Sequence, residues 1–387
     1  MYAEHWAKDH KEIKILALAD YSSENRFNVD TVDNLHVERV WSRTMSRNQI
    51  VNIIKNKVET FAPDIVHLHY NYFTFGGMMK SHMVLNDILE LVSGKNIKSL
   101  ITLHSVVYKP LSRIITDMLY THIYTDKFEF MFRGLFNRTL RLTLFKANAV
   151  VTPSISAYDY VHKLRINKTY SIFYIPLGYE FSAKIPYVNN LSSSRINISF
   201  IGTLSPYKGV DLLIKSFVMI NNTKENVDLT IYGNPVTKAR KDDKYLRRLY
   251  GLVKSNQLEG VCHIEPRFHD YDELMSLIFK SNIIVFPFKD DGILSMSASP
   301  YLALNTTSKI VVTDSPRLSD FTGIGEVDIA KSGSVESLTN SILKAIEKLD
   351  AVRVTSQSFL QRHDVKTVSE QYYDLLMKLY SFSSPKE

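Results

Sequence analysis

The fold follows from one stretch of the chain, Ile198-Ser-Phe-Ile-Gly202-Thr-Leu-Ser-Pro-Tyr-Lys208-Gly209-Val-Asp-Leu-Leu213. Its apolar start, residues 198–201, is typical of a buried parallel strand. Gly202 ends this run, and Gly209 precedes an amphipathic segment that predicts a helix. Lys208 therefore lies at a helix entrance, where free backbone N–H groups and the positive end of the helix dipole suit a phosphate. Taken alone, the loop is equally consistent with an ordinary turn and a solvated lysine.

Length and composition indicate a globular protein of two domains. The chain has 387 residues, of which 45% are hydrophobic and 22% charged. A single cysteine, Cys262, excludes an internal disulfide and favours a reducing compartment. No apolar run approaches the roughly 18–20 residues of a membrane span, and we expect a cytoplasmic location. The net charge of +7 indicates an acidic partner: nucleotide phosphates, an anionic membrane surface or nucleic acid.

The first half alternates between strands and helices. Helices are predicted at about 47–61 and 85–91 and from Ser154 onward, and strands at 64–70, 99–105, 149–153 and 171–176. His104 ends a predicted central strand, and the carboxyl edge of an open α/β sheet is the usual place for a ligand. A histidine there is somewhat more often structural when nothing else is known. His67 and His69 lie inside a strand, and we interpret both as structural.

The second half repeats the pattern. Strands are predicted at 228–233, 261–266, 283–288 and 309–313, and helices at about 242–255, 271–280 and 334–349. The polar segment 186–195 is typical of a linker. We predict an N-terminal domain over 1–185, a C-terminal domain over 196–364, and a last helix in 365–387 that could return to the first domain. Two doubly wound Rossmann-like domains would then face each other across a cleft.

The segment 107–146 combines aromatic and basic residues, including Arg133, Arg138 and Arg141. Such a segment can lie on an anionic bilayer, as a peripheral membrane contact or on the acceptor side. The alternative is an ordinary helix pair with a solvated basic face. Nucleic acid ranks third, because no recognised binding motif accompanies the charge.

The chain begins with a predicted helix, Tyr2–Asp9, and only then a strand at 13–19. An α/β domain normally opens with a strand, because its first helix needs a sheet to cover. We therefore expect either an unusual sheet edge or an initial strand and loop encoded upstream of Met1.

Seven short motifs in a fixed order resemble the family-four retaining glycosyltransferases of the GT-B fold. The motifs are Asp64-Ile-Val-His-Leu-His, Thr102-Leu-His104, Ala149-Val-Val-Thr-Pro-Ser154, Ile175-Pro-Leu-Gly178, Gly202-Thr-Leu-Ser-Pro-Tyr-Lys-Gly209, Ile231-Tyr-Gly233, and Asp291-Gly292 after Phe-Pro-Phe. Each motif is weak, but the ordered set is fairly specific and covers nearly the whole chain. The resemblance implies a nucleotide-diphosphate sugar on the C-terminal domain and an acceptor over the N-terminal domain.

The resemblance assigns residues to the donor site, with two departures. Lys208 would contact the diphosphate, but Thr203 stands where the family usually has an arginine, so the site must depend more on Lys208 and backbone amides. Of the family's two acidic positions, Asp291 matches the first, which binds hydroxyls of the transferred sugar, with Asp290 as the alternative. Ser299 occupies the second, which usually contacts the ribose.

The remaining donor contacts also follow from the resemblance. His104 matches a histidine beside the transferred sugar, and Phe268 lies where a loop meets the nucleotide base through its main chain. The other donor-binding positions are Gly202, Gly233, Gly292, Ile293 and Leu294.

We therefore expect a retaining glycosyltransferase that moves a hexose from a nucleotide-diphosphate sugar to a hydroxyl of a glycan or lipid-linked acceptor. Lys208 and loop amides would stabilise the leaving diphosphate, and His104 and Asp291 would position the sugar. We expect no required metal or other cofactor, and no nucleic-acid partner. The alternatives are a nucleotide-sugar epimerase, which would isomerise its substrate without an acceptor, and a non-catalytic subunit that keeps the fold.

Overall fold

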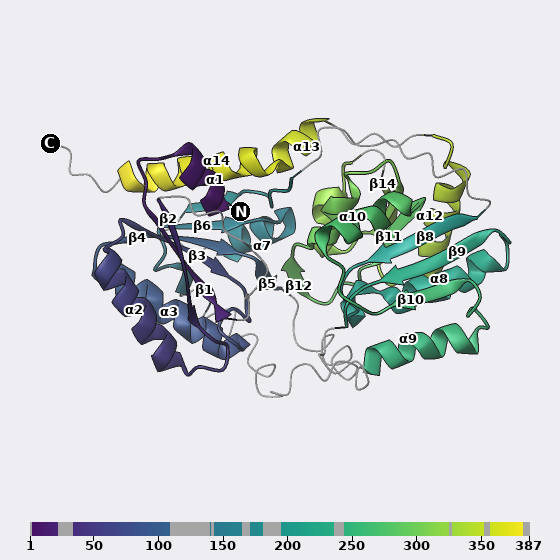
Figure 1. Cartoon of the computed structure of the whole chain (residues 1–387), viewed down its shortest axis with the longest axis horizontal. Helices are drawn as coiled ribbons and strands as arrows, with labels where there is room; N and C mark the ends of the chain where they lie inside the picture. Colours follow the sequence, from purple (N-terminus) through teal and green to yellow (C-terminus); the bar gives the residue numbers. More distant parts are fainter. Residues whose placement is uncertain are drawn as a thin grey trace. The chain divides into compact units, whose positions relative to one another are not determined.

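The computed structural model describes residues 2–21, 34–108, 140, 143–164, 171–180, 195–235, 244–324, 327–351 and 357–381 (Figure 1). Internal contacts divide the chain into two compact units. The first unit holds the described elements up to Tyr174 together with the last helix, and the second holds those from Ile196 to Glu347. A short helix, α13 (Gln357–His363), carries the chain from the second unit back to the first. Of the expected linker 186–195, only Arg195 is among the described residues.

The first unit is built on parallel strands. Strands β3, β4, β6 and β7 form one sheet in that order, and β1 pairs with β2 in a second parallel ladder. The elements are α1 (Tyr2–Asp9), β1 (Ile15–Asp20), β2 (Leu35–Trp41), α2 (Arg47–Phe61), β3 (Ile65–Tyr70), α3 (Met78–Gly94), β4 (Lys98–Leu103), β5 (Ser105–Val107), β6 (Ala149–Thr152), α7 (Ile155–Leu164), β7 (Ser171–Tyr174) and α14 (Val365–Ser381).

The two ends of the described chain pack together in the first unit. Helix α14 runs beside α1 in Figure 1, and the indole Nε1 of Trp6 donates to the Ser369 carbonyl at 2.8 Å. Trp6 and Tyr372 share one apolar cluster with Leu100 and Ala149 of the sheet. Burying these side chains contributes about 1.5–3 kcal/mol each, so α1 and α14 are integral parts of this unit.

The second unit is built on a six-stranded parallel sheet, with helices and one short strand, Ile293–Ser295, outside that sheet. The elements are β8 (Ile196–Ile201), α8 (Val210–Asn221), β9 (Val227–Tyr232), α9 (Lys244–Ser255), β10 (Cys262–Glu265), α10 (Tyr271–Lys280), β11 (Ile283–Phe286), β12 (Ile293–Ser295), α11 (Ala298–Ala303), β13 (Lys309–Thr313), β14 (Val327–Ala330) and α12 (Val335–Glu347). Helix α8 packs between α9 and α12. The side chains of Ile198, Phe200 and Phe217 are fully buried and form part of the core of this unit.

The strand order of this sheet, β10-β9-β8-β11-β13-β14, fixes where a ligand can bind. From β8 the chain builds outward through β9 and β10, and then crosses to β11 and builds outward the other way. The order therefore reverses between β8 and β11. In open α/β sheets, ligands bind outside the carboxyl ends of the strands at such a switch point. We therefore expect a ligand to bind at the loops that follow β8 and β11.

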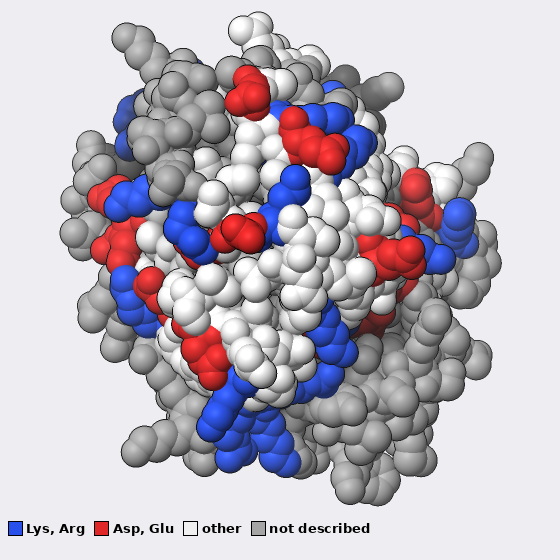
Figure 2. All heavy atoms as spheres, turned by 90° about the vertical axis from the view of Figure 1, so that its right-hand side faces the viewer, with Lys and Arg blue, Asp and Glu red and all other residues white. Residues whose placement is uncertain are grey.

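Charge is mixed on the face of the molecule that lies at the right in Figure 1 and is turned toward the viewer in Figure 2. Figure 2 shows Lys and Arg interspersed with Asp and Glu over most of the described part of that face, with basic side chains gathered at its lower edge. Mixed charge of this kind is typical of an ordinary solvated surface. Within the described ranges, none of the helices has the length and hydropathy needed to cross a bilayer.

Candidate functional site

Lys208 lies at the switch point as a buried cation. It ends a 3₁₀ turn, Pro206–Lys208, that follows β8, and it is only 3% exposed. Its Nζ donates to the Ser297 hydroxyl at 2.7 Å and lies 4.0 Å from the centre of the Phe288 ring. Among the residues that the structure describes, no carboxylate forms an ion pair with this ammonium. The side chain is therefore placed to meet an anion that the described chain does not supply.

Burial holds the pKa of Lys208 well below its usual value, and the nearby charge of Arg317 lowers it further, while Asp291 opposes the shift. A buried ammonium whose direct contacts are a hydroxyl and ring faces is costly. A bound phosphate would offset that cost, because an opposite charge in a poorly solvated site favours the charged form. The electrostatics of this loop therefore suit an anionic ligand.

Arg317 is a site residue that the sequence analysis missed. Its Nε donates to Asp291 Oδ1 at 3.0 Å, and its Nη2 donates to Asp291 Oδ2 at 2.7 Å. Its Nη1 donates to the Ser295 hydroxyl, and the guanidinium stacks 4.2 Å from the centre of the Tyr207 ring. Asp291 is thus held in a bidentate ion pair. Nothing in the sequence links two residues 26 positions apart on separate loops.

At Gly209 and Gly233, the backbone lies very close to the backbone of another loop of the site. Gly209 has φ +71°, and a Cβ at this position would lie 1.8 Å from the Pro287 carbonyl oxygen. A Cβ on Gly233 would lie 1.8 Å from the Gly202 carbonyl oxygen, and one on Gly202 would lie 3.4 Å from the Ser299 hydroxyl. The structure therefore brings Gly202, Gly233 and Ser299 together, as it does Lys208 and Ser297.

Gly209→Ala should destabilise the protein by about 2 kcal/mol or more, because the alanine would be strained at positive φ and would also collide with the Pro287 carbonyl. Gly251→Ala is the matched control: a Cβ on this residue of α9 meets no atom within 4 Å, so the change should stabilise the helix by about 0.5–1 kcal/mol. Urea unfolding of both variants measures the difference. Equal stability of the two would contradict the close approach.

The other predicted donor residues lie on nearby connections of the second unit. Thr203 is exposed directly after β8, and Phe268 is 57% exposed after β10. Gly292 precedes β12, which contains Ile293 and Leu294. Asp290, the alternative to Asp291, accepts a hydrogen bond from the Gly292 backbone at 3.1 Å, as a turn residue does.

His104 belongs to the first unit, where it follows β4. Its Nε2 lies 3.0 Å from His69 Nδ1, and the two rings stack with centres 5.3 Å apart. Burial lowers the pKa of His104 to about 4. Burial also holds the pKa of His69 well below its usual range, with His67 and His104 adding to the shift. Both rings are therefore neutral near pH 7, and the N–H of one donates a hydrogen bond to the ring nitrogen of the other. His69, interpreted from the sequence as structural, is thus the hydrogen-bond partner of His104.

His67 extends this cluster and supports a pH prediction. Its Nε2 lies 2.8 Å from the Thr102 hydroxyl, and burial, followed by the charge of His104, lowers its pKa to about 3. The unfolded chain takes up a proton at this residue as the pH falls below about 6.5, whereas the folded protein resists protonation until about pH 3. Stability must therefore decrease as the pH falls from about 6.5 to 3.

We expect the melting temperature of the wild type to decrease between pH 7 and pH 5, and that of His67→Gln to decrease less. Glutamine can keep a hydrogen bond to Thr102, and it does not titrate. Thermal unfolding at several pH values gives the comparison. Parallel profiles for the two proteins would show that His67 is not the group responsible.

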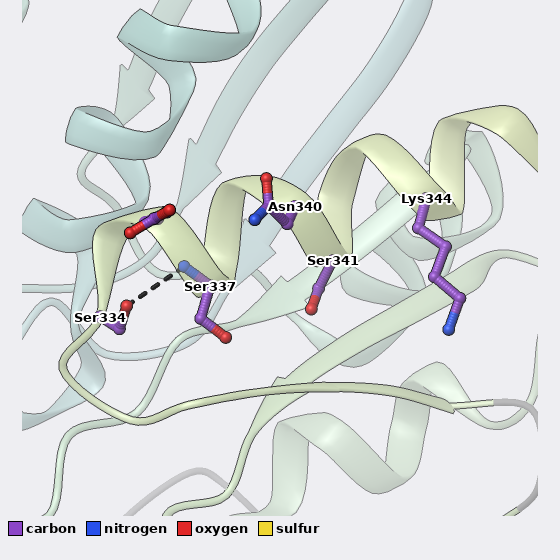
Figure 3. Close-up of a pocket in the computed structure, with 6 residues that line it drawn as sticks. Ser334, Ser337, Asn340, Ser341 and Lys344 are labelled. Carbon is purple, nitrogen blue, oxygen red and sulfur yellow. Dashed lines mark hydrogen bonds between the residues drawn. The ribbon is translucent and has the colours of Figure 1, made fainter.

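Arg133, Arg138 and Arg141 lie outside the described residues, so the membrane contact stays a prediction. A pocket in the second unit is lined from one helix, α12, and none of the predicted donor residues lines it; Figure 3 shows Ser334, Ser337, Asn340, Ser341 and Lys344 along that helix. Within the described ranges, no three His, Cys, Asp or Glu side chains form a group that could hold a metal ion.

Comparison with known proteins relates this architecture to sugar-transferring enzymes. Residues 182–354 match the family described as glycosyl transferases group 1. Sucrose-phosphate synthase from Thermosynechococcus elongatus has a similar structure, with 16% identity, a TM-score of 0.73, and coverage of 98% of this chain and 92% of that one. A glycosyltransferase from Rickettsia africae has 13% identity and a TM-score of 0.63, over 89% of this chain and 85% of that one.

The Anabaena protein HepE, in complex with UDP, is also similar, with 14% identity, a TM-score of 0.64, and coverage of 89% of this chain and 86% of that one. No curated protein sequence in the comparison matches the chain. The resemblance to group 1 glycosyltransferases and the predicted GT-B fold are confirmed.

Proposed function

We propose that this chain, whose second half matches the group 1 glycosyltransferases, transfers a hexose from a nucleotide-diphosphate sugar to a hydroxyl acceptor, with retention of configuration. One observation carries the proposal: Lys208 is a buried cation without a carboxylate partner in the described chain, at the switch point of the second unit's sheet. A leaving diphosphate is an anion of the size and charge that such a site would stabilise.

The reaction depends on positive charge that the protein holds beside the diphosphate before the bond breaks. As the bond between the anomeric carbon and the diphosphate oxygen breaks, negative charge grows on the phosphate. Lys208, which is buried directly before α8, stabilises that charge. The acceptor hydroxyl forms the new bond on the face that the phosphate leaves, and its proton passes to the departing phosphate oxygen. This step requires no metal ion and no second carboxylate.

His104 has the role of positioning the transferred sugar. Its neutral ring is held in one orientation by the hydrogen bond between its Nε2 and His69 Nδ1. A neutral imidazole held in one orientation can hydrogen-bond a sugar hydroxyl close to the reacting carbon. The acceptor that fits the basic composition is a glycan or a lipid-linked saccharide, and segment 107–146 would contact the anionic membrane that carries such a lipid.

The test is to incubate the protein with a panel of nucleotide-diphosphate sugars and candidate acceptors. Mass spectrometry would detect donor consumption and the glycosylated product, and NMR would give the anomeric configuration. We expect one donor to be consumed only when an acceptor is present, with retention. Isomerisation of the donor without an acceptor would instead support an epimerase, and an inverted product would contradict retention.

A non-catalytic subunit that keeps the fold is the second candidate. Its support is that Thr203 and Ser299 depart from the family pattern and that both oxygens of Asp291 already accept hydrogen bonds from Arg317. A folded protein that binds no nucleotide sugar in a calorimetric titration would favour this candidate.

A further inference from the structure

We propose that Arg317 is a second diphosphate-binding cation, which acts with Lys208 and supplies from another loop the charge that Thr203 lacks. This inference rests on the proposed function.

Arg317 stacks on the ring of Tyr207, which belongs to the same turn as Lys208. The Arg317 guanidinium lies 4.2 Å from the centre of the Tyr207 ring, and Lys208 Nζ lies 5.2 Å from that centre. Burial raises the pKa of Tyr207, whereas Arg317 and hydrogen bonding by the side chain of Thr203 lower it. The guanidinium and Thr203 are thus both neighbours of one tyrosine.

The charge balance leaves this cluster positive. Lys208 and Arg317 contribute two cations, and Asp291 contributes one carboxylate, which the ion pair with Arg317 engages. The side chains of Arg317 and Asp291 are only 10% and 16% exposed, so water screens the cluster poorly. A bound diphosphate would favour the protonated form of Lys208, and the cluster would then meet it with a net charge of about +1 in a poorly solvated place.

Asp291 acts here as a positioning residue. Two parallel N–H···O bonds fix the plane of the guanidinium, and the Ser295 hydroxyl accepts a third bond. A guanidinium fixed in this way keeps its positive charge at a defined place, where it can attract phosphate oxygens, and a hydroxyl such as that of Thr203 carries no such charge. Because the ion pair already fixes the Arg317 side chain, binding of a diphosphate would cost little further side-chain entropy.

A purely structural role makes a different prediction. If Arg317 only clamps the loop that carries Asp291, then Arg317→Gln and Asp291→Asn break the same clamp and should change ligand affinity equally. If Arg317 contacts the diphosphate, then Arg317→Gln should weaken binding much more, because Asp291→Asn leaves both cations in place.

The experiment titrates UDP, ADP and GDP, each with its parent nucleoside, into the full chain by calorimetry. For the diphosphate that binds, we expect Arg317→Gln to lower the affinity about tenfold to a hundredfold, and Asp291→Asn to lower it by a much smaller factor. Affinity for the nucleoside should not change. Adding Thr203→Arg to Arg317→Gln should recover part of the lost affinity, because it restores a cation beside Tyr207.

Circular dichroism and thermal melting establish that each variant is folded, and Arg317→Met, which also removes the charge, replaces Arg317→Gln if the latter fails to fold. Equal losses in Arg317→Gln and Asp291→Asn, or unchanged diphosphate affinity in a folded Arg317 variant, would overturn the inference and leave the proposed function standing. A wild type that binds none of the three diphosphates would overturn both.

Discussion

Lys208→Met is expected to weaken binding of the donor diphosphate by about 1.5–3 kcal/mol, the range for a hydrogen bond to a charged group. Methionine keeps an apolar stem of similar length against Phe288 but removes the ammonium. Because this ammonium is buried and has no carboxylate partner in the described chain, its removal should leave the empty protein equally stable or slightly more stable. Calorimetric titration and thermal melting measure the two effects.

Lys289→Met provides the matched control. Lys289 lies in the neighbouring loop, but its Nζ is 2.8 Å from the carboxylate of Asp211, whose side chain is only 3% exposed. Breaking that pair should lower stability by about 1 kcal/mol or more, because Asp211 keeps Arg248 and the Tyr245 hydroxyl as partners, and should leave donor affinity largely intact. If Lys208→Met instead destabilised the fold and spared binding, Lys208 would be a structural residue.

His104→Ala is expected to lower turnover on the order of a hundredfold, the size of effect that loss of substrate positioning can produce. The donor diphosphate should still bind, because Lys208 is unchanged, so kcat should decrease far more than the affinity for the nucleoside diphosphate. Steady-state kinetics with the donor and acceptor found by the panel, together with calorimetry, separate the two quantities.

The control for His104 is His67→Gln, in the same histidine cluster but inside β3 and hydrogen-bonded to Thr102. We expect it to keep most of the turnover. His104→Asn serves if the alanine variant does not fold. Full activity in either His104 variant would show that this histidine supports the sheet and not the reaction.

Local signals explain what the sequence could predict. The predicted helix at about 47–61 matches α2, because Ser46 and Gln49 form a capping box, a start signal that is readable from spacing alone. The buried strand 198–201, the glycines and the helix after Gly209 predicted the Lys208 turn, and the structure places these features at the switch point.

Features that depend on pairing between distant segments could not be predicted. Strand β2 was missed because Glu38 and Arg39 interrupt its apolar pattern, and the structure shows Glu38 paired with Lys57 of α2. The contact of His69 with His104 depends on the register of β3 against β4, which pairs Tyr70 with Leu103. No local spacing encodes that register.

The same reason applies to Asp291. The resemblance assigned it to sugar hydroxyls, but its ion pair with Arg317 depends on how two loops of the second unit fold against each other. Only the tertiary structure shows that this carboxylate already has a strong partner and that a second cation lies beside Lys208.

The most direct test of a nucleotide-sugar site at the Lys208 turn is a calorimetric titration of the wild-type chain with a panel of nucleotide-diphosphate sugars, repeated with Lys208→Met. We predict that at least one donor binds the wild type and that its affinity decreases about tenfold or more in the variant. A folded wild type that binds none of them, or a donor that binds both proteins equally, would contradict the account.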